Sequence, residues 1–210
     1  KQSGGSGQFG EVHITIEPYF DDMPEPQGVN IRNKEIEELP WGGKFAFYWC
    51  IVGGAIDNRY ATAIKKGIMH EMTEGPLTGS NCQNIRVCIY DGKMHAVDSN
   101  DISFQLAASH AFRMAFNEAK PQLLEPYYHL EVLCEDNHTG DVMGDLQTRR
   151  AIIQGMDTDG HYQKIIAEVP LAELKDYGSS LRSLTQGKAK FKLEFSNYQL
   201  VPPHIQENLV

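Results

Sequence analysis

The sequence predicts an α+β protein built from two domains. The chain has 210 residues, and its 41% hydrophobic content can form one large core or two ordinary ones. Both halves contain strand-like and helix-like apolar patterns, and the second half follows the order β-α-β-β-α-β. The stretch "KPQLLEP" interrupts these patterns and predicts a joint near residue 121. We therefore expect one domain over residues 1–121 and a second over 122–210.

Two different apolar patterns predict the first two strands. Residues 8–16 alternate apolar and polar side chains, which is typical of a half-buried strand. Residues 44–54 form a continuous apolar run closed by two glycines, which predicts a strand buried on both faces. Between them, residues 17–43 have no apolar period and contain four prolines. We expect a long loop throughout this segment.

The rest of the first domain is predicted as helix, strand and helix. Residues 59–74 have helical spacing, and Gly75-Pro76 stops them. The apolar run 82–92 predicts a strand that leads into a tight turn at Asp91-Gly92.

The second helix is expected to begin at a cap formed by Asp98 or Ser99 and to run to about Ala119. Its apolar positions are expected to include Ile102, Leu106 and Phe116.

The second half alternates compactly between strands and helices. The expected elements are a strand at 127–134, a helix at 138–150, strands at 151–157 and 162–170, a helix at 171–184 and a last strand at 189–201. This β-α-β-β-α-β order within about 75 residues predicts a ferredoxin-like fold. Residues 202–210 are expected to begin another helix.

Composition limits the possible partners and compartments. The net charge is −9 and both halves are acidic, which excludes a broad basic face for nucleic acid, so any contact with RNA must be local. No apolar run approaches the ~20 residues that span a bilayer. The four cysteines are widely spaced without a CxxC motif, which favours reduced buried thiols over disulfides or zinc.

Individual residues do not by themselves define an active site. The opening "KQSGGSGQFG" precedes a strand and has no Lys-Ser/Thr after its glycines, so it is not a phosphate-binding loop. His95 is expected in an exposed loop, and a metal-dependent hydrolase using His95 with Asp98 lacks a second histidine or cysteine. Arg149-Arg150 at a helix end are interpreted as solvated charges.

Several short motifs taken together resemble a known family. They occur along nearly the whole chain in the order "KQSGGSGQFG", "IVGGAI", "EGPLTG", "YDGKMHAVDS", "AKPQLLEP", "GDVMGDLQTRR", "VPLAEL", "LRSLTQGKA" and "EFSNY". In this order they resemble the last two domains, IV and V, of the translation elongation factor G family. The resemblance implies a ribosomal protein S5 domain 2-like α/β domain followed by a ferredoxin-like domain.

The resemblance also implies where the first domain acts. Its tip is expected to enter the decoding site of the ribosome and to promote tRNA–mRNA translocation. Two loops would form this tip, and glycines in the first would let the backbone approach RNA closely. The expected RNA-contact residues are Ser3, Gly4, Gly5, Ser6, Gly7 and Gln8 in the first loop, and Lys93, Met94, His95, Ala96, Val97 and Asp98 in the second.

For the second domain, the resemblance implies docking near the sarcin–ricin loop of the rRNA and the stalk-base proteins. The candidate large-subunit contacts are Gly140, Asp141, Arg149 and Arg150. No catalytic residue, metal or cofactor is expected in this chain; GTP and Mg are expected in a G domain that the chain lacks. The implied parent is a cytoplasmic translational GTPase without a membrane partner, and this chain is expected to be monomeric.

Four departures from the family pattern favour a divergent paralogue. Met94 stands where the family usually has tyrosine, Ala96 where it has aspartate or proline after the tip histidine, and Asp57 where it has proline. The segment "NIRNKEIEELPWGGK" also makes the first long loop longer than the family pattern predicts. Two alternatives to a translocation factor remain open, a ribosomal protection protein and a stand-alone RNA- or protein-binding module. An upstream GTPase motif would exclude the stand-alone module.

Overall fold

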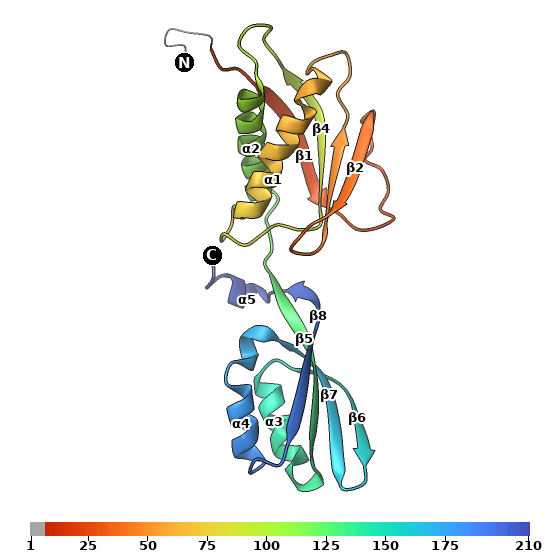
Figure 1. Cartoon of the computed structure of the whole chain (residues 1–210), viewed down its shortest axis with the longest axis vertical. Helices are drawn as coiled ribbons and strands as arrows, with labels where there is room; N and C mark the ends of the chain where they lie inside the picture. The colour runs from red at the N-terminus through yellow and green to blue at the C-terminus, as the bar shows by residue number, and fades with distance from the viewer. Residues whose placement is uncertain (1–6) are drawn as a thin grey trace. The chain divides into compact units, whose positions relative to one another are not determined.

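The computed structural model describes residues 7–210, which form two compact units, each with its own sheet and core (Figure 1). The first unit ends at Pro121, and the second spans Gln122–Leu209. The predicted α+β class with two domains is confirmed. Among the described residues, no helix is both long enough and apolar enough to cross a membrane.

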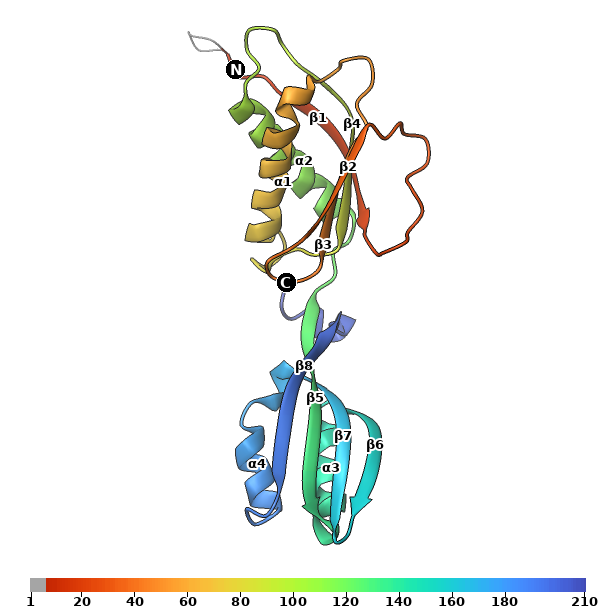
Figure 2. The ribbon, with the colours of Figure 1, turned by 45° about the vertical axis from the view of Figure 1, so that its right-hand side comes forward.

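Unit 1 contains a four-stranded sheet with two helices on one face. Its strands are β1 (Glu11–Pro18), β2 (Asn33–Glu38), β3 (Lys44–Trp49) and β4 (Ile85–Lys93). They lie in the order β1-β4-β3-β2, with β3 and β4 parallel and the other two pairs antiparallel. The helices α1 (Ala61–Glu74) and α2 (Asp101–Glu118) lie side by side on the sheet (Figure 2).

The central strand β3 is buried on both faces. Phe45, Phe47 and Trp49 face the helices, where they join the main core with α1 and α2. On the opposite face, Tyr48 and neighbouring buried residues are covered by apolar side chains of the segment 19–32. This double burial explains the continuous apolar run, which lacks the alternation of a strand with one solvated face.

The prediction of a loop throughout residues 17–43 was wrong. β1 continues to Pro18, and residues 33–38 form β2, which pairs antiparallel with β3. β2 is an edge strand with mostly charged side chains; its Glu35 and Glu37 accept hydrogen bonds from Lys65 Nζ at 2.7 and 3.1 Å. The backbone hydrogen bonds to β3 and these ion pairs hold β2 in place. The strand therefore does not need alternating apolar side chains, and its sequence lacks the pattern by which a strand is usually recognised.

The predicted turn at Asp91-Gly92 was also wrong, because β4 continues through both residues. The register shifts by one residue here: His13 pairs with Asp91 while Ile14 pairs with Ile89. A Cβ on Gly92 would lie only 2.2 Å from the carbonyl oxygen of Glu11. Glycine is therefore required by the close approach of β1 beside a bulge, and not by a turn.

Helix α2 begins later than predicted and faces the core mainly with other residues, although the predicted Phe116 does pack against the core. Its N-cap is Asn100, whose Oδ1 accepts a hydrogen bond from Ser103 N at 2.8 Å, while Ser103 Oγ accepts one from Asn100 N at 3.0 Å. This reciprocal capping box replaces the expected cap at Asp98 or Ser99. The expected apolar positions Ile102 and Leu106 are exposed, and the fully buried side chains are Phe104, Ala108 and Phe112.

Unit 2 has the predicted ferredoxin-like topology. Its strands β5 (Leu124–Glu135), β6 (Ile152–Asp159), β7 (Tyr162–Pro170) and β8 (Lys190–Leu200) form an antiparallel sheet in the order β6-β7-β5-β8. The helices α3 (Thr139–Thr148) and α4 (Tyr177–Leu184) cover one face of this sheet (Figure 1). The short helix α5 (Pro203–Gln206) follows the last strand.

The single helix predicted at 171–184 is in fact interrupted. A 3-10 helix, η3 (Leu171–Leu174), is separated from α4 by Lys175 and Asp176. Asp176 has a φ of 58°, a left-handed conformation that no α-helix can contain. Pro170 is both the last residue of β7 and the N-cap of η3.

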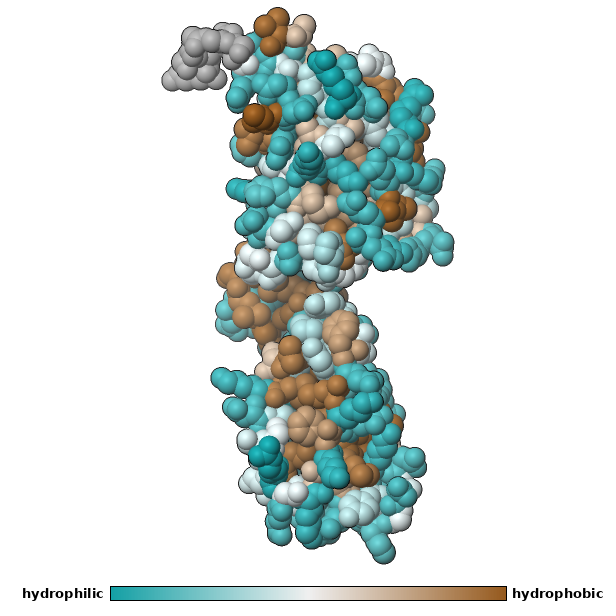
Figure 3. Space-filling view, in the orientation of Figure 1, coloured by the Kyte–Doolittle hydropathy of each residue, from teal (hydrophilic) through white to brown (hydrophobic). Residues whose placement is uncertain are grey.

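The edge strand β8 presents apolar side chains to solvent. Figure 3 shows apolar residues gathered on the visible face of unit 2 around this strand. The exposed aromatic residues on β8 are Phe191, Phe195 and Tyr198, and Phe195 packs edge-to-face against Tyr128 and Tyr198. Half-exposed aromatic groups of this kind are suited to contact with another protein surface.

We predict that all four thiols are unreactive in the folded chain. Every cysteine is free and buried, and burial raises the pKa of Cys50 and Cys82 to about 11. At pH 8 only about one in a thousand of these two groups is then a thiolate, the form that reacts. Titration with Ellman's reagent should detect no thiol in the native chain and four in urea. Fast labelling of the native chain would contradict the buried placement.

Candidate functional site

Two loops that are about 90 residues apart in sequence meet at one end of unit 1. Residues 7–10 lead into β1, and residues 94–100 connect β4 to α2. Phe9 N donates to the carbonyl oxygen of Asp98 at 2.9 Å. Ser99 Oγ accepts a hydrogen bond from His95 N at 2.8 Å and donates one to the carbonyl oxygen of Phe9 at 2.9 Å. The Ser99 hydroxyl thus bridges the two loops, because it is hydrogen-bonded to a backbone group of each.

His95 is the most prominent side chain of this paired structure. Its ring stacks on Phe9 with centroids 4.1 Å apart and an interplanar angle of 19°. Its Nδ1 lies 3.6 Å from Oδ2 of Asp98, and the side chain is 58% exposed. The imidazole is therefore oriented by one aromatic face and one carboxylate while the rest of it meets solvent. Such a group can stack on a base or exchange a hydrogen bond with RNA.

Glycines allow the first loop to lie close to the second and to α2. A Cβ on Gly7 would lie 3.1 Å from Oδ1 of Asp98, and a Cβ on Gly10 would lie 2.9 Å from the carbonyl oxygen of Ser103. Larger residues at these positions would push the first loop away from His95.

The structure describes the predicted tip residues only in part. Ser3, Gly4, Gly5 and Ser6 lie outside the described residues, whereas Gly7 and Gln8 lie beside the second loop. In the second loop, Val97 is 80% and Met94 39% exposed, and Lys93 Nζ lies 3.8 Å from Glu11 Oε1. The loops therefore present a mixed surface with backbone, imidazole and apolar groups.

The surroundings of His95 and Asp98 also bear on the hydrolase alternative. Within residues 7–210, no group of three or more His, Cys, Asp or Glu side chains is arranged to hold a metal ion. In the same part of the chain, the side chains of the His95–Asp98 pair have no nucleophilic serine or cysteine hydrogen-bonded to them. The structure thus gives no support to the hydrolase alternative.

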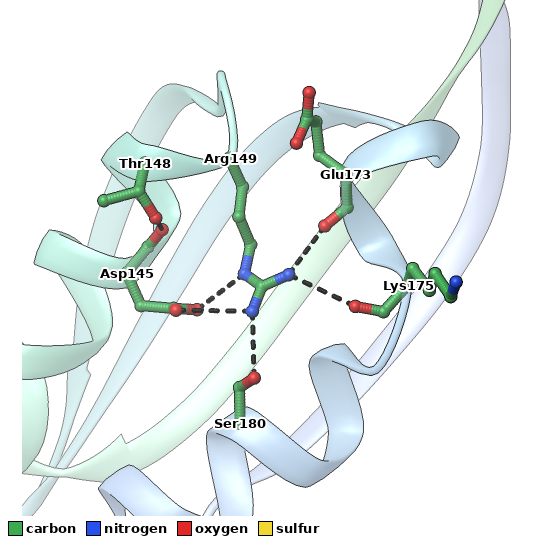
Figure 4. A network of polar contacts seen from close by, with 6 residues as sticks. All are labelled: Asp145, Thr148, Arg149, Glu173, Lys175 and Ser180. Atoms are coloured by element: carbon green, nitrogen blue, oxygen red, sulfur yellow. Dashed lines mark hydrogen bonds and ion pairs between the residues drawn. The ribbon is translucent and has the colours of Figure 1, made fainter.

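Arg149, one of the predicted contacts in unit 2, lies at the centre of a second, structural cluster (Figure 4). Arg149 Nε donates to Asp145 at 2.8 Å, Nη2 to Ser180 Oγ at 3.0 Å, and Nη1 to the carbonyl oxygen of Glu173 at 2.7 Å. Its guanidinium also lies over the ring of Tyr177, 5.2 Å from the centroid. Arg149 therefore joins α3, η3 and α4, and only 15% of its side chain is exposed.

Arg150 is similarly engaged within the unit. Its guanidinium binds both carboxylate oxygens of Glu125 at 2.7 and 3.0 Å and donates to Glu173 at 2.8 Å. The hydrogen bond to Glu125 is the largest of the effects that raise its pKa. Gly140 and Asp141, by contrast, lie at the exposed start of α3. A role of these four residues in contacting a large partner stays a prediction.

Sequence reasoning missed the residues that hold the site together. Phe9 was not singled out, and Ser99 was considered only as a possible helix cap, because neither has chemistry that marks it alone. Tyr60 was expected only as part of the helical pattern over residues 59–74, but its hydroxyl donates to the carbonyl oxygen of Ser99 at 3.0 Å. A search for hydrogen-bonding residues beside the tip histidine could have found Ser99, whereas Phe9 and Tyr60 become evident only from the fold.

Comparisons with known proteins match both units. The family model "Elongation factor G, domain IV" matches residues 31–120, and "Elongation factor G C-terminus" matches residues 122–209. An elongation factor G-like protein of Thermotoga maritima is 40% identical over all of this chain and 28% of its own length. Elongation factor G of Aquifex pyrophilus is 41% identical over all of this chain and 27% of its own length.

A solved structure is similar to this chain in both fold and sequence. A crystal structure of a Thermus thermophilus protein has a TM-score of 0.71 and 35% identity, covering 94% of this chain and 30% of that one. The chain thus spans less than a third of the length of the relatives it matches. Because relatives with both names are about equally similar, the divergent paralogue stays a prediction.

Proposed function

The chain belongs to the elongation factor G family, and from this premise we propose that it is the ribosome-contacting part of a translation factor. In this proposal the loops around His95 enter the decoding site and promote movement of tRNA and mRNA. The stacked and hydrogen-bonded pairing of Phe9, His95 and Ser99 carries the proposal, because it holds an exposed imidazole in a fixed position. An acidic chain can contact RNA when the contact is confined to such a tip.

Unit 2 is proposed to dock on the large subunit, near the sarcin–ricin loop and the stalk-base proteins. The exposed aromatic residues of β8 support a protein partner for this unit. GTP and Mg would be bound by a G domain outside this chain, and the parent would act in the cytoplasm. The chain itself is proposed to be monomeric.

We predict that His95→Ala in the full-length protein slows translocation about tenfold, because one stacking and hydrogen-bonding group is lost at the RNA contact. The measurement is single-turnover movement of tRNA and mRNA on purified ribosomes. Ribosome pelleting at two salt concentrations should show nearly unchanged, salt-sensitive binding, because most of the contact surface remains.

The matched control is His110→Ala, which removes an exposed histidine from α2 and should leave the rate unchanged. A parental translocation rate for His95→Ala would show that the tip assignment is wrong. Failure of the unaltered protein to bind ribosomes at either salt concentration would overturn the proposed function as a whole.

A further inference from the structure

A third segment lies beside the paired loops and is not used by the proposed function. The connection from β3 to α1 includes the 3-10 helix η1 (Asn58–Tyr60), and the Tyr60 hydroxyl is hydrogen-bonded to the carbonyl oxygen of Ser99. An open cleft of about 720 Å³ lies between this segment and the start of α2. It is lined by Arg59, Tyr60, Ser99, Asn100, Asp101 and Ile102.

Arg59 is held in a fixed orientation at this cleft. Its guanidinium lies over the ring of Tyr60, 4.7 Å from the centroid, and Nη2 donates to the Tyr60 hydroxyl at 2.7 Å. The side chain is nevertheless 65% exposed. Within the described residues its remaining polar contact is long, 3.9 Å from Nε to Oδ2 of Asp57. A planar, aromatic-backed guanidinium is therefore available to a ligand.

The charges around the cleft do not favour an isolated phosphate as its ligand. Asp57 lies beside the Arg59 guanidinium, and Asp101 belongs to the lining of the cleft. The two acids therefore offset the attraction of Arg59 for an anion. A neutral planar group with N–H donors on its edge suits both the guanidinium and the carboxylates, because it can stack on the first and donate a hydrogen bond to one of the second. Ile102, which is 60% exposed, adds an apolar wall.

We infer that this cleft binds an unstacked nucleobase of single-stranded RNA, with the base stacked on Arg59 and its edge donating to Asp101. The inference rests on the proposed RNA contact of the neighbouring loops, since Tyr60 connects the cleft to Ser99. Unstacked bases of single-stranded RNA commonly stack on the planar guanidinium group of an arginine in this way.

The test compares RNA with and without bases. The complete 210-residue chain is titrated with a fluorescent RNA hexamer and with an abasic hexamer of the same backbone. We expect the unaltered chain to bind the base-bearing hexamer more tightly. Arg59→Ala and Arg59→Lys should each weaken that binding about tenfold, since lysine keeps the charge but loses the stacking plane. Both variants should bind the two hexamers equally.

Three results would overturn the inference: equal binding of the two hexamers by the unaltered chain, full affinity of Arg59→Lys, or no binding of either hexamer. Arg32→Ala is the matched control, because it removes an exposed arginine from the 19–32 segment and should leave both affinities unchanged. The translocation assay separates the two proposals. If His95→Ala slowed translocation and Arg59→Ala did not, the proposed function would be supported, but the cleft would have no part in it.

Discussion

Gly67→Ala is expected to destabilise unit 1 by about 2 kcal/mol. A Cβ at this position of α1 would lie 2.2 Å from the carbonyl oxygen of Gln105 on α2, and Ser109 Oγ already donates to the carbonyl oxygen of Gly67 at 3.0 Å. Separating the helices costs about 3 kcal/mol, whereas alanine in a helix interior gains only about 1 kcal/mol over glycine. The clash therefore outweighs the gain in helix propensity.

Urea unfolding followed by tryptophan fluorescence measures this effect in unit 1 alone, because Trp41 and Trp49 are the only tryptophans of the chain. Gly144→Ala in α3 is the control, for which we expect a change in the free energy of unfolding of the opposite sign. Nothing lies within 4 Å of a Cβ at Gly144, so only the propensity gain applies and unit 2 should become slightly more stable. An unchanged or higher fluorescence midpoint for Gly67→Ala would contradict the close helix crossing.

Most of the fold can be predicted from the sequence wherever the burial of one face places apolar residues at regular intervals. The helix α1 buries Ile64, Ile68 and Met72 at the spacing from which it was predicted. The order of elements in unit 2 was likewise sufficient for its topology. Both predictions depend on a local pattern of apolar residues, which arises because each helix or strand buries one of its faces.

The failures occur where distant backbone contacts replace such a pattern. β2 exists because β3 offers a ladder, so its charged side chains give no signal of their own. The turn expected at Asp91-Gly92 is a strand because β1 lies against it. In α2, the exposed Ile102 lines the cleft beside Arg59 and does not join the core. A single sequence cannot distinguish these tertiary contacts from ordinary loop and helix signals.

The candidate site shows the same division. His95 came from the family motif, and its role in contacting RNA stays a prediction. Ser99 lies four residues from His95 in the same loop. Phe9, by contrast, is brought to them by the pairing of β1 with β4, across about 90 residues of sequence. Local motifs can therefore identify the exposed residue, but its aromatic partner depends on the fold.

Arg149→Met is expected to destabilise unit 2 by about 3 kcal/mol. The substitution leaves Asp145 without its partner, and the carbonyl oxygen of Glu173 loses a donor, while methionine keeps most of the volume over Tyr177. Removing one partner of a largely buried ion pair costs more than the pair itself contributes. Far-UV circular dichroism should show an earlier urea transition, while the tryptophan transition of unit 1 stays in place.

Arg182→Met is the matched control, because it removes an exposed arginine from α4 and should shift neither transition. The comparison also tests the role that the family resemblance implies for Arg149. If Arg149→Met left unit 2 as stable as before but weakened ribosome binding, the guanidinium would act on a partner and not on the packing of α3 against α4. With four of its contacts already inside the unit, we expect the loss of stability, and any loss of ribosome binding should follow from it.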